Sequence, residues 1–289
     1  MKAFAHVLKA VAVCLLAIAA VAGEPNDGII VDSNIIKSKQ QSKSITLDPL
    51  SGRPLYLIQV KGTQALGTAT GFVVTQDKKN YLITNWHVVS GRAPGSNTIL
   101  HPSGQVPDAL LIWHHGRTLG TWVRKREVLH DKKGKIRWAE HSKGRAVDVV
   151  ALPLQAVDDD VRVYPFDLAL ADADMVPEVA MPISIIGFPV GLTSAGVFPI
   201  WKTGHIASEP ALDFKGKPLC LIDATTRGGM SGSPVVLRLS GGYKTKSGGT
   251  IMSSSGHKTL FLGIYSGRLP RDSEIGLVWR PQVIRDILK

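Results

Sequence analysis

The segment Gly229–Pro234, with the sequence Gly-Met-Ser-Gly-Ser-Pro, contains residue types that could present a nucleophile. Glycines on both sides of Ser231 let the backbone bend sharply and expose the serine hydroxyl. A serine hydroxyl is a weak nucleophile at neutral pH unless a neighbouring base accepts its proton. Taken alone, the segment could also be a glycine-rich surface turn. It supports a catalytic hypothesis only together with a histidine and a carboxylate that orients it.

A histidine and an aspartate in suitable surroundings precede the serine. His87 ends the apolar run 81–89, where a structural histidine at a strand end is the alternative. Asp148 lies alone in the hydrophobic run 146–152. An ionised carboxylate among valines is costly to bury, so Asp148 needs a hydrogen-bonding or charged partner. The order His87, Asp148, Ser231, with separations of 61 and 83 residues (148 − 87 and 231 − 148), predicts a catalytic triad.

The motifs around these three residues together resemble those of the trypsin-like serine peptidases, which have the chymotrypsin fold, and in particular their bacterial branches without disulfides. Thr-Asn-Trp-His-Val-Val at 84–89 is similar to the histidine motif of Deg-type periplasmic proteases and glutamyl endopeptidases. The serine motif at 231–235 resembles that of the glutamyl endopeptidases. The resemblance covers most of the chain from about residue 52 onward. Further matches in the same order are 67–74, 148–152 and 186–192.

The resemblance implies an all-β fold of two six-stranded antiparallel β-barrels with a short C-terminal helix. The sequence agrees, because it has many short β-rich runs separated by glycine and proline turns, and helical spacing only at 281–288. We expect an N-terminal barrel at 51–165, and a C-terminal barrel with the terminal helix at 166–289. The triad would then straddle the cleft between two lobes.

The same resemblance assigns roles to the site residues. His87 would accept the proton of Ser231, Asp148 would orient the imidazole, and the backbone N–H groups of Gly229 and Ser231 would form the oxyanion hole. No activity of this kind needs a cofactor. We expect no metal either, because no acid or cysteine lies at ligand spacing from the pair His114-His115.

Five residues are predicted to bind the substrate: Thr225, Thr226, Tyr265, Ser266 and Gly267. Thr225 occupies the position where cleavage after Lys or Arg would require an acid, so that specificity is not favoured. Tyr265 occupies the place where glutamyl endopeptidases keep a histidine. Thr226 nevertheless matches a pocket residue of those enzymes, so an acidic preference stays open. The pattern favours a small or medium uncharged side chain before the cleaved bond.

The composition indicates the class of protein, and the first residues predict its location. With 289 residues, 44% hydrophobic and 20% charged, the chain is that of a globular protein. Residues 1–22 combine a basic start, the apolar stretch 10–22 and Ala-Val-Ala before Gly23, which predicts a cleaved signal peptide and export to the periplasm or beyond. An uncleaved membrane anchor is the alternative, but thirteen apolar residues are fewer than the roughly 20 that span a bilayer. Residues 23–50 read as an extended or disordered lead-in, and no later segment resembles a membrane span.

Two further features bear on partners. Cys14 leaves with the signal peptide and Cys220 has no internal partner, so no intrachain disulfide is expected. The net charge is +11, and ten basic residues fall between Arg117 and Arg145. This stretch is either a solvated hairpin or a weak contact for an anionic polymer or the cell envelope; no specific nucleic acid is expected.

Three functional interpretations follow. The first is a secreted serine endopeptidase that acts on polypeptides, the second a catalytically inactive protease fold that serves as a binding module, and the third an anion-binding surface protein.

Overall fold

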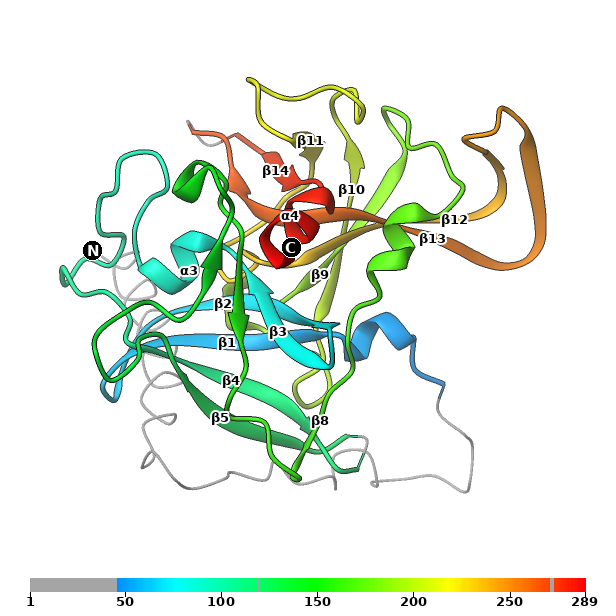
Figure 1. The fold of residues 1–289 in the computed structure, drawn as a ribbon. Coiled ribbons are helices and arrows are strands. Elements are labelled where there is room, and N and C mark those ends of the chain that lie inside the picture. The colour runs from blue at the N-terminus through cyan, green and yellow to red at the C-terminus, as the bar shows by residue number, and fades with distance from the viewer. Residues whose placement is uncertain (1–45, 119, 271–272) are drawn as a thin grey trace, which may run out of the picture.

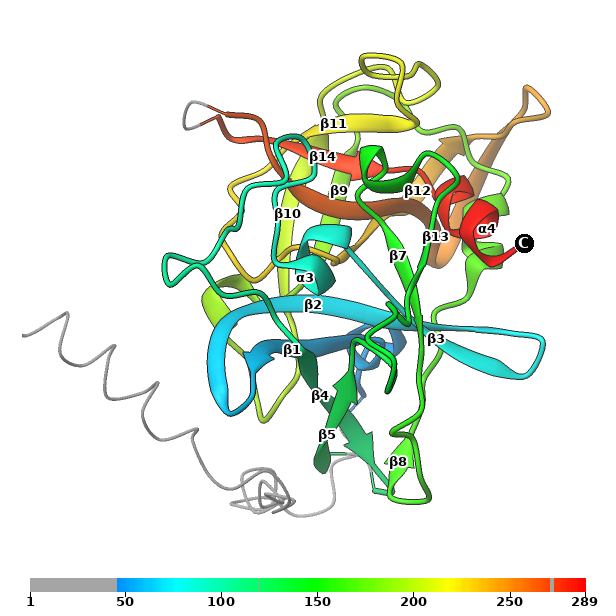
Figure 2. The same ribbon diagram turned by 60° about the vertical axis from the view of Figure 1, so that its left-hand side comes forward.

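The computed structural model describes residues 46–118, 120–270 and 273–289, with only the main chain for 253–255 (Figure 1). The predicted signal peptide, 1–22, and most of the predicted lead-in lie outside these residues. Two lobes of β-strands lie one above the other, with a short helix, α3, between them (Figures 1 and 2). The all-β fold with a short C-terminal helix, predicted from the sequence, is confirmed.

The first lobe is an antiparallel sheet with the strand order β5-β4-β1-β2-β3-β7-β6, in which β8 pairs with β4. Its strands are β1 (Pro54–Lys61), β2 (Gln64–Gln76), β3 (Lys79–Thr84), β4 (Ala109–Gly116), β5 (Trp122–Val128), β6 (Ala139–Glu140), β7 (Val150–Pro153) and β8 (Val161–Arg162). Between β2 and β3 the chain reverses at Asp77 and Lys78, which both have positive φ, at 49° and 62°. Positive φ at both central residues is the geometry of a two-residue hairpin that matches the strand twist.

The second lobe is the expected six-stranded closed barrel, in the order β10-β11-β14-β13-β12-β9. Its strands are β9 (Pro182–Gly187), β10 (Ile200–Ile206), β11 (Leu219–Asp223), β12 (Pro234–Lys244), β13 (Thr250–Arg268) and β14 (Ile275–Trp279). The first lobe differs from a second copy of this barrel, because its eight strands pair along an open path within the described residues. Residues 129–138 leave the sheet after β5, and the chain returns only as the two-residue strand β6 on β7.

Helical elements are few and short. The α-helices are α3 (Trp86–Ser90) and α4 (Gln282–Leu288), and the 3-10 turns are η1 (Pro49–Gly52), η2 (Gly144–Ala146), η3 (Leu168–Asp172) and η4 (Pro189–Gly191). The side chain of Asp48 caps η1 by accepting from Leu50 N–H at 2.9 Å, and Leu50 is buried. Residues a few positions before Pro54 therefore already belong to the folded part. None of the helices in the described ranges has the length and apolar character needed to cross a bilayer.

One hydrophobic cluster joins the two lobes and the C-terminal helix. Phe72 of β2, Phe166 of the connection and Phe261 of β13 contact one another, with ring centroids 5.1 Å apart for Phe72–Phe166 and 4.6 Å for Phe166–Phe261. Val283 and Ile284 of α4 are buried in the same cluster. Because burial of apolar surface is the main stabilising contribution to a fold, this shared core fixes how the lobes face each other.

Candidate active site

Strand pairing brings His87 and Asp148 to the same edge of the first sheet. Strands β3 and β7 are antiparallel, and Thr84 lies opposite Val150. In an antiparallel pair, the residues after Thr84 and the residues before Val150 extend from the same end of the two strands. His87 and Asp148 therefore lie close together just beyond that end. Asn85 is extended before α3, and Gly91, with φ of 66°, ends the helix in the left-handed conformation.

The two side chains form a double contact. The Asp148 carboxylate accepts from His87 Nδ1 at 2.7 Å and from the His87 main-chain N–H at 2.9 Å. The side chains are 17% exposed for His87 and 7% for Asp148. Burial lowers the pKa of His87, but the charge and hydrogen bond of Asp148 outweigh it, and the net pKa is raised above 6.5. With Nδ1–H donating to the carboxylate, Nε2 is the nitrogen left to act as a base.

The loop that carries Ser231 requires its glycines. Gly229 and Gly232 have φ of 89° and 87°, a region that residues with a Cβ rarely occupy. A Cβ on Gly229 would lie 2.2 Å from the Phe188 carbonyl oxygen, and one on Gly232 would lie 2.0 Å from the Thr70 carbonyl oxygen. Space and backbone conformation thus both explain why glycine stands on either side of this serine.

Hydrogen bonding in this loop leaves two N–H groups free. The N–H groups of Met230, Gly232 and Ser233 donate to the carbonyls of Arg227 (3.3 Å), Tyr265 (2.9 Å) and Met230 (3.0 Å). Those of Gly229 and Ser231 donate to no acceptor in the described part of the chain. These are the two N–H groups that the sequence predicted for an oxyanion hole. Unpaired main-chain donors two residues apart in such a loop can stabilise a developing negative charge.

The serine loop packs against the strands that lead to His87. The Ser231 carbonyl accepts from Thr70 N–H at 2.8 Å. Gly232 lies against Thr84, because a Cβ there would come 2.5 Å from Thr84 Oγ1, and Thr84 is three residues before His87. Ser231 is half-buried, and no hydrogen bond joins its hydroxyl to His87 among the described residues. In uncomplexed enzymes such catalytic hydrogen bonds are often long and tighten only with substrate.

Two of the five predicted substrate-binding residues form a buried pair beside the serine loop. The hydroxyls of Thr226 and Tyr265 lie 2.5 Å apart, with Thr226 0% and Tyr265 2% exposed. Tyr265 N–H donates to the Ser233 carbonyl at 2.9 Å, which holds this tyrosine next to the loop. Burial raises the pKa of Tyr265, so its hydroxyl stays protonated at neutral pH.

The other three predicted substrate-binding residues differ in their environment. Ser266 accepts from Trp279 Nε1 at 3.0 Å, so part of its hydrogen-bonding capacity is already used. Gly267, next along β13, has φ of 125°. Thr225 is exposed.

Glu140 is a residue of this site that sequence reasoning missed. One of its carboxylate oxygens, Oε1, accepts from the indole N–H groups of Trp86 at 2.8 Å and Trp138 at 2.9 Å. Trp86 opens the helix that carries His87, so Glu140 fixes that helix to β6. The sequence does not indicate this contact, because the strand that positions Glu140, β6, is only two residues long and shows no alternating pattern.

A cavity of about 180 Å³ lies beside His87. Its other lining residues come from the first lobe: Gln59, Leu66, Gly91, Leu100, His101, Pro102, Gln105 and Pro107. Leu100 is 53% exposed, so this side of the histidine offers an apolar surface.

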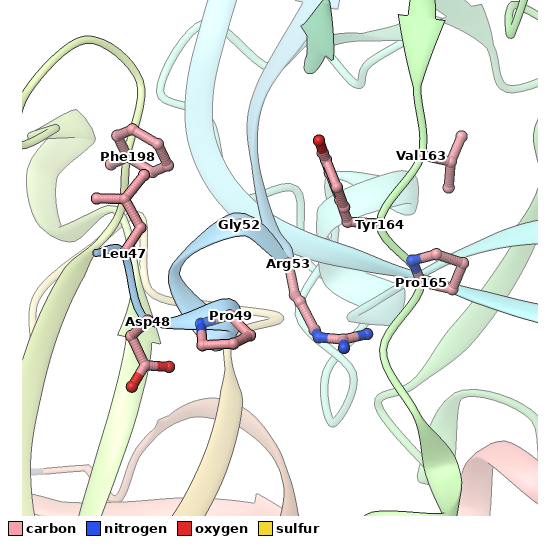
Figure 3. Close-up of a pocket in the computed structure, with 9 residues that line it drawn as sticks. All are labelled: Leu47, Asp48, Pro49, Gly52, Arg53, Val163, Tyr164, Pro165 and Phe198. Atoms are coloured by element: carbon pink, nitrogen blue, oxygen red, sulfur yellow. The ribbon is translucent and has the colours of Figure 1, made fainter. Parts of the chain in front are cut away.

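Figure 3 shows a larger pocket, of about 350 Å³, that contains none of the predicted site residues. Arg53 extends into it between Pro49 and Pro165, while Leu47 and Phe198 line the opposite side. Asp48, also in its lining, pairs with Arg238 of the barrel.

The basic stretch between Arg117 and Arg145 is partly neutralised by ion pairs. Four of its cations contact acids: Arg117–Asp160, Lys125–Asp158, Arg126–Asp108 and Arg137–Glu127. No group of three side chains able to ligate a metal occurs among the described residues. His114 is buried, and burial, followed by His115 and Lys125, lowers its pKa to about 4. Cys220 is also buried, which raises the pKa of its thiol to about 11.

One family model and several solved structures resemble this chain. No curated protein sequence matches the chain. Among solved structures, the active form of the Rv3671c protease from M. tuberculosis has 17% identity and a TM-score of 0.46, over 87% of this chain and 93% of that one. A thermostable serine protease, AL20, from an extremophilic microorganism has 12% identity and a TM-score of 0.46, over 83% and 97%. The family model of the trypsin-like peptidase domain matches residues 69–241, more than half of the sequence. The chain belongs to the trypsin-like peptidase family.

Proposed function

We propose that this trypsin-like serine peptidase is an endopeptidase that cleaves polypeptides with His87, Asp148 and Ser231. The observation that carries the proposal is the double contact of Asp148 with His87, at 2.7 and 2.9 Å, on the lobe against which the Ser231 loop packs. A buried carboxylate that holds both the ring and the main chain of one histidine fixes its tautomer and position. No observation favours the alternative of an inactive binding module.

The proposed reaction proceeds through an acyl-enzyme. The Ser231 hydroxyl oxygen attacks the peptide carbonyl carbon while His87 Nε2 takes its proton, and Asp148 stabilises the imidazolium that forms. The carbonyl oxygen becomes an oxyanion that accepts from the N–H groups of Gly229 and Ser231. The tetrahedral intermediate then collapses, and His87 gives the proton to the leaving amine. Water repeats the attack with His87 as base, which releases the acid product and restores the serine.

The Thr226–Tyr265 pair supports a preference for small or medium uncharged side chains before the cleaved bond. Both hydroxyls are buried and hydrogen-bonded to each other, so neither presents a charged partner for a charged side chain of the substrate. Cleavage of a peptide library measures this preference, and a clear preference for Lys or Arg would contradict it.

Export is proposed from residues 1–22, which lie outside the described residues. The expected mature chain starts at Gly23, and sequencing the amino terminus of the protein purified from its natural source tests this. An amino terminus that still contains the apolar stretch would point to the membrane-anchor alternative.

A fluorophosphonate probe tests the proposed chemistry. We expect covalent labelling of the wild-type protein and none of Ser231→Ala. Labelled peptide mapping should place the probe on Ser231. A folded wild-type protein that is not labelled would support the binding module instead.

A further inference from the structure

Each carbonyl of residues 228–231 in the serine loop accepts a hydrogen bond. The four acceptors and their donors are Gly228 O with Val190 N–H (2.6 Å), Gly229 O with the Thr70 hydroxyl (2.8 Å), Met230 O with Ser233 N–H (3.0 Å) and Ser231 O with Thr70 N–H (2.8 Å). A trans peptide unit is planar, so its C=O and N–H point in opposite directions. The bonds to Gly228 O and Met230 O therefore aim the free N–H groups of Gly229 and Ser231.

Thr70 provides two of these four bonds and connects three segments. It lies in β2 of the first lobe and is 0% exposed. Its hydroxyl donates to Gly229 O and accepts from Phe188 N–H at 3.2 Å. Its own carbonyl accepts from the Thr84 hydroxyl at 2.8 Å, close to the start of the histidine helix. One side chain thus joins the serine loop of the barrel to the turn that follows β9.

That turn is conformationally strained where it contacts the serine loop. Val190 has φ of 48° and ψ of 29°, the left-handed region that β-branched residues avoid. Its side chain is 63% exposed, so side-chain burial does not account for the strain. The conformation directs Val190 N–H to Gly228 O. Strained residues persist only where the surrounding contacts hold them, and the Thr70 hydroxyl bond to Phe188 N–H is such a contact two residues away.

We propose that Thr70 is a positioning residue for the oxyanion site. Its hydroxyl fixes the Gly229–Met230 peptide unit, which lies between the two N–H groups of the oxyanion site. Through Phe188 it also anchors the turn whose Val190 N–H sets the direction of the Gly229 N–H. Thr70 touches no substrate, and it acts through the loop. The inference rests on the proposed function, since the two N–H groups matter only if an oxyanion forms there.

The test compares Thr70→Ser with Thr70→Ala, which differ by a single hydroxyl. For Thr70→Ser we expect kcat within about 3-fold of the wild type. For Thr70→Ala we expect kcat to fall about 10- to 100-fold, with KM changed less than about 3-fold, because the lost interaction acts only in the transition state. The rate of fluorophosphonate labelling should fall in parallel. If Thr70→Ala does not fold, Thr70→Val, which fills the volume but lacks the hydroxyl, replaces it with the same expectation.

Thr245→Ala is the matched control, because Thr245 is also buried and its hydroxyl bonds within the turn between β12 and β13. It should lower the melting temperature without lowering kcat. Equal kcat values for the serine and alanine variants at position 70 would overturn the positioning role. So would a fall in kcat of Thr245→Ala as large as that of Thr70→Ala. Absent labelling of the wild type would instead reject the proposed function, and the positioning role with it.

Discussion

At the scale of single residues, Asp148 has two separable effects on His87. The contact with Nδ1 sets the tautomer and raises the pKa of the imidazole, while the contact with the main-chain N–H places the first turn of α3. Burial acts in the opposite direction on the pKa, because it disfavours the charged ring. The carboxylate therefore determines whether the histidine can hold a proton during the proposed reaction.

Replacing Asp148 with Asn should reveal this balance in the pH dependence. In the wild type, kcat/KM should rise with pH through an apparent pKa above 6.5, since the base must be neutral. In Asp148→Asn the apparent pKa should fall, because burial then dominates, and kcat should drop by roughly 10⁴-fold. Peptidase assays from pH 5 to about 9 measure both. An unchanged pH profile in the variant would contradict the pairing.

The same raised pKa has a consequence for stability. Because the folded-state value lies above the unfolded value of 6.5, the His87–Asp148 pair stabilises the fold fully below pH 6.5. That contribution is lost as the pH rises through the folded-state value. Asp148→Asn should therefore lower the melting temperature more at pH 6 than at pH 9.

Gly232 offers a second test at the residue scale. Gly232→Ala places a Cβ 2.0 Å from the Thr70 carbonyl, a main-chain atom that cannot move aside cheaply. Gly134→Ala is the control, since Gly134 has a similar φ of 78° but open space around it. Both variants share the cost of about 1 kcal/mol for a left-handed alanine. Denaturant unfolding should show a clearly larger loss for Gly232→Ala, and equal losses would contradict the close packing of the two lobes here.

At the scale of elements, the sequence predicted the long β-rich runs and missed both the shortest helical elements and the contacts between distant residues. The apolar run 81–89 was visible, but the five-residue helix α3 inside it is too short for a helical period to show. Asp48-Pro49 is a typical start of a helical turn. It was missed because it lies at the end of the polar stretch 23–50, which was predicted to be extended or disordered. Thr70 belongs to a recognised match, 67–74, but its hydroxyl bond to Gly229 joins residues 159 positions apart. No periodicity encodes such a contact.

Strand β4, next to the end strand β5 of the first sheet, carries a pH-dependent contribution to stability. His114 is buried there, and burial, His115 and Lys125 together lower its pKa to about 4, while Asp158 opposes them weakly. Between pH 6.5 and about 4 the unfolded chain binds a proton that the folded chain does not, so stability falls on acidification. Across this pH range the free energy of unfolding falls by an amount on the order of 3 kcal/mol because of His114.

Replacing this histidine tests that contribution. We expect His114→Phe to flatten the loss of stability between pH 6.5 and 4, measured by denaturant unfolding. His257→Gln is the control, because His257 is exposed and should leave the curve unchanged. A wild-type curve that does not fall in this range would show that the His114 side chain is less buried than described.

At the scale of the whole molecule, the proposed site depends on two lobes that share a core. The Phe72, Phe166 and Phe261 rings come from the sheet, the connection and the barrel, and α4 closes the same cluster with Val283 and Ile284. The hydrogen bonds of Thr70 to the serine loop cross between the same lobes. The boundary that we expected between residues 165 and 166 falls between strands β8 and β9. The hydrophobic cluster, however, contains residues from both sides of this boundary.

The shared core should make the two lobes unfold together. We expect one calorimetric transition, and we expect Val283→Ala to shift it as a whole, with a loss of about 1–3 kcal/mol for a buried valine. Val179→Ala, at a residue that is 45% exposed and outside the shared cluster, is the control and should leave the transition within about 0.5 kcal/mol. Two transitions, only one of which moves in Val283→Ala, would show that the lobes fold separately. In that case the contact between the Ser231 loop and the strands near His87 would depend on docking of preformed lobes, and peptidase activity would be lost at the docking step, before either lobe unfolds.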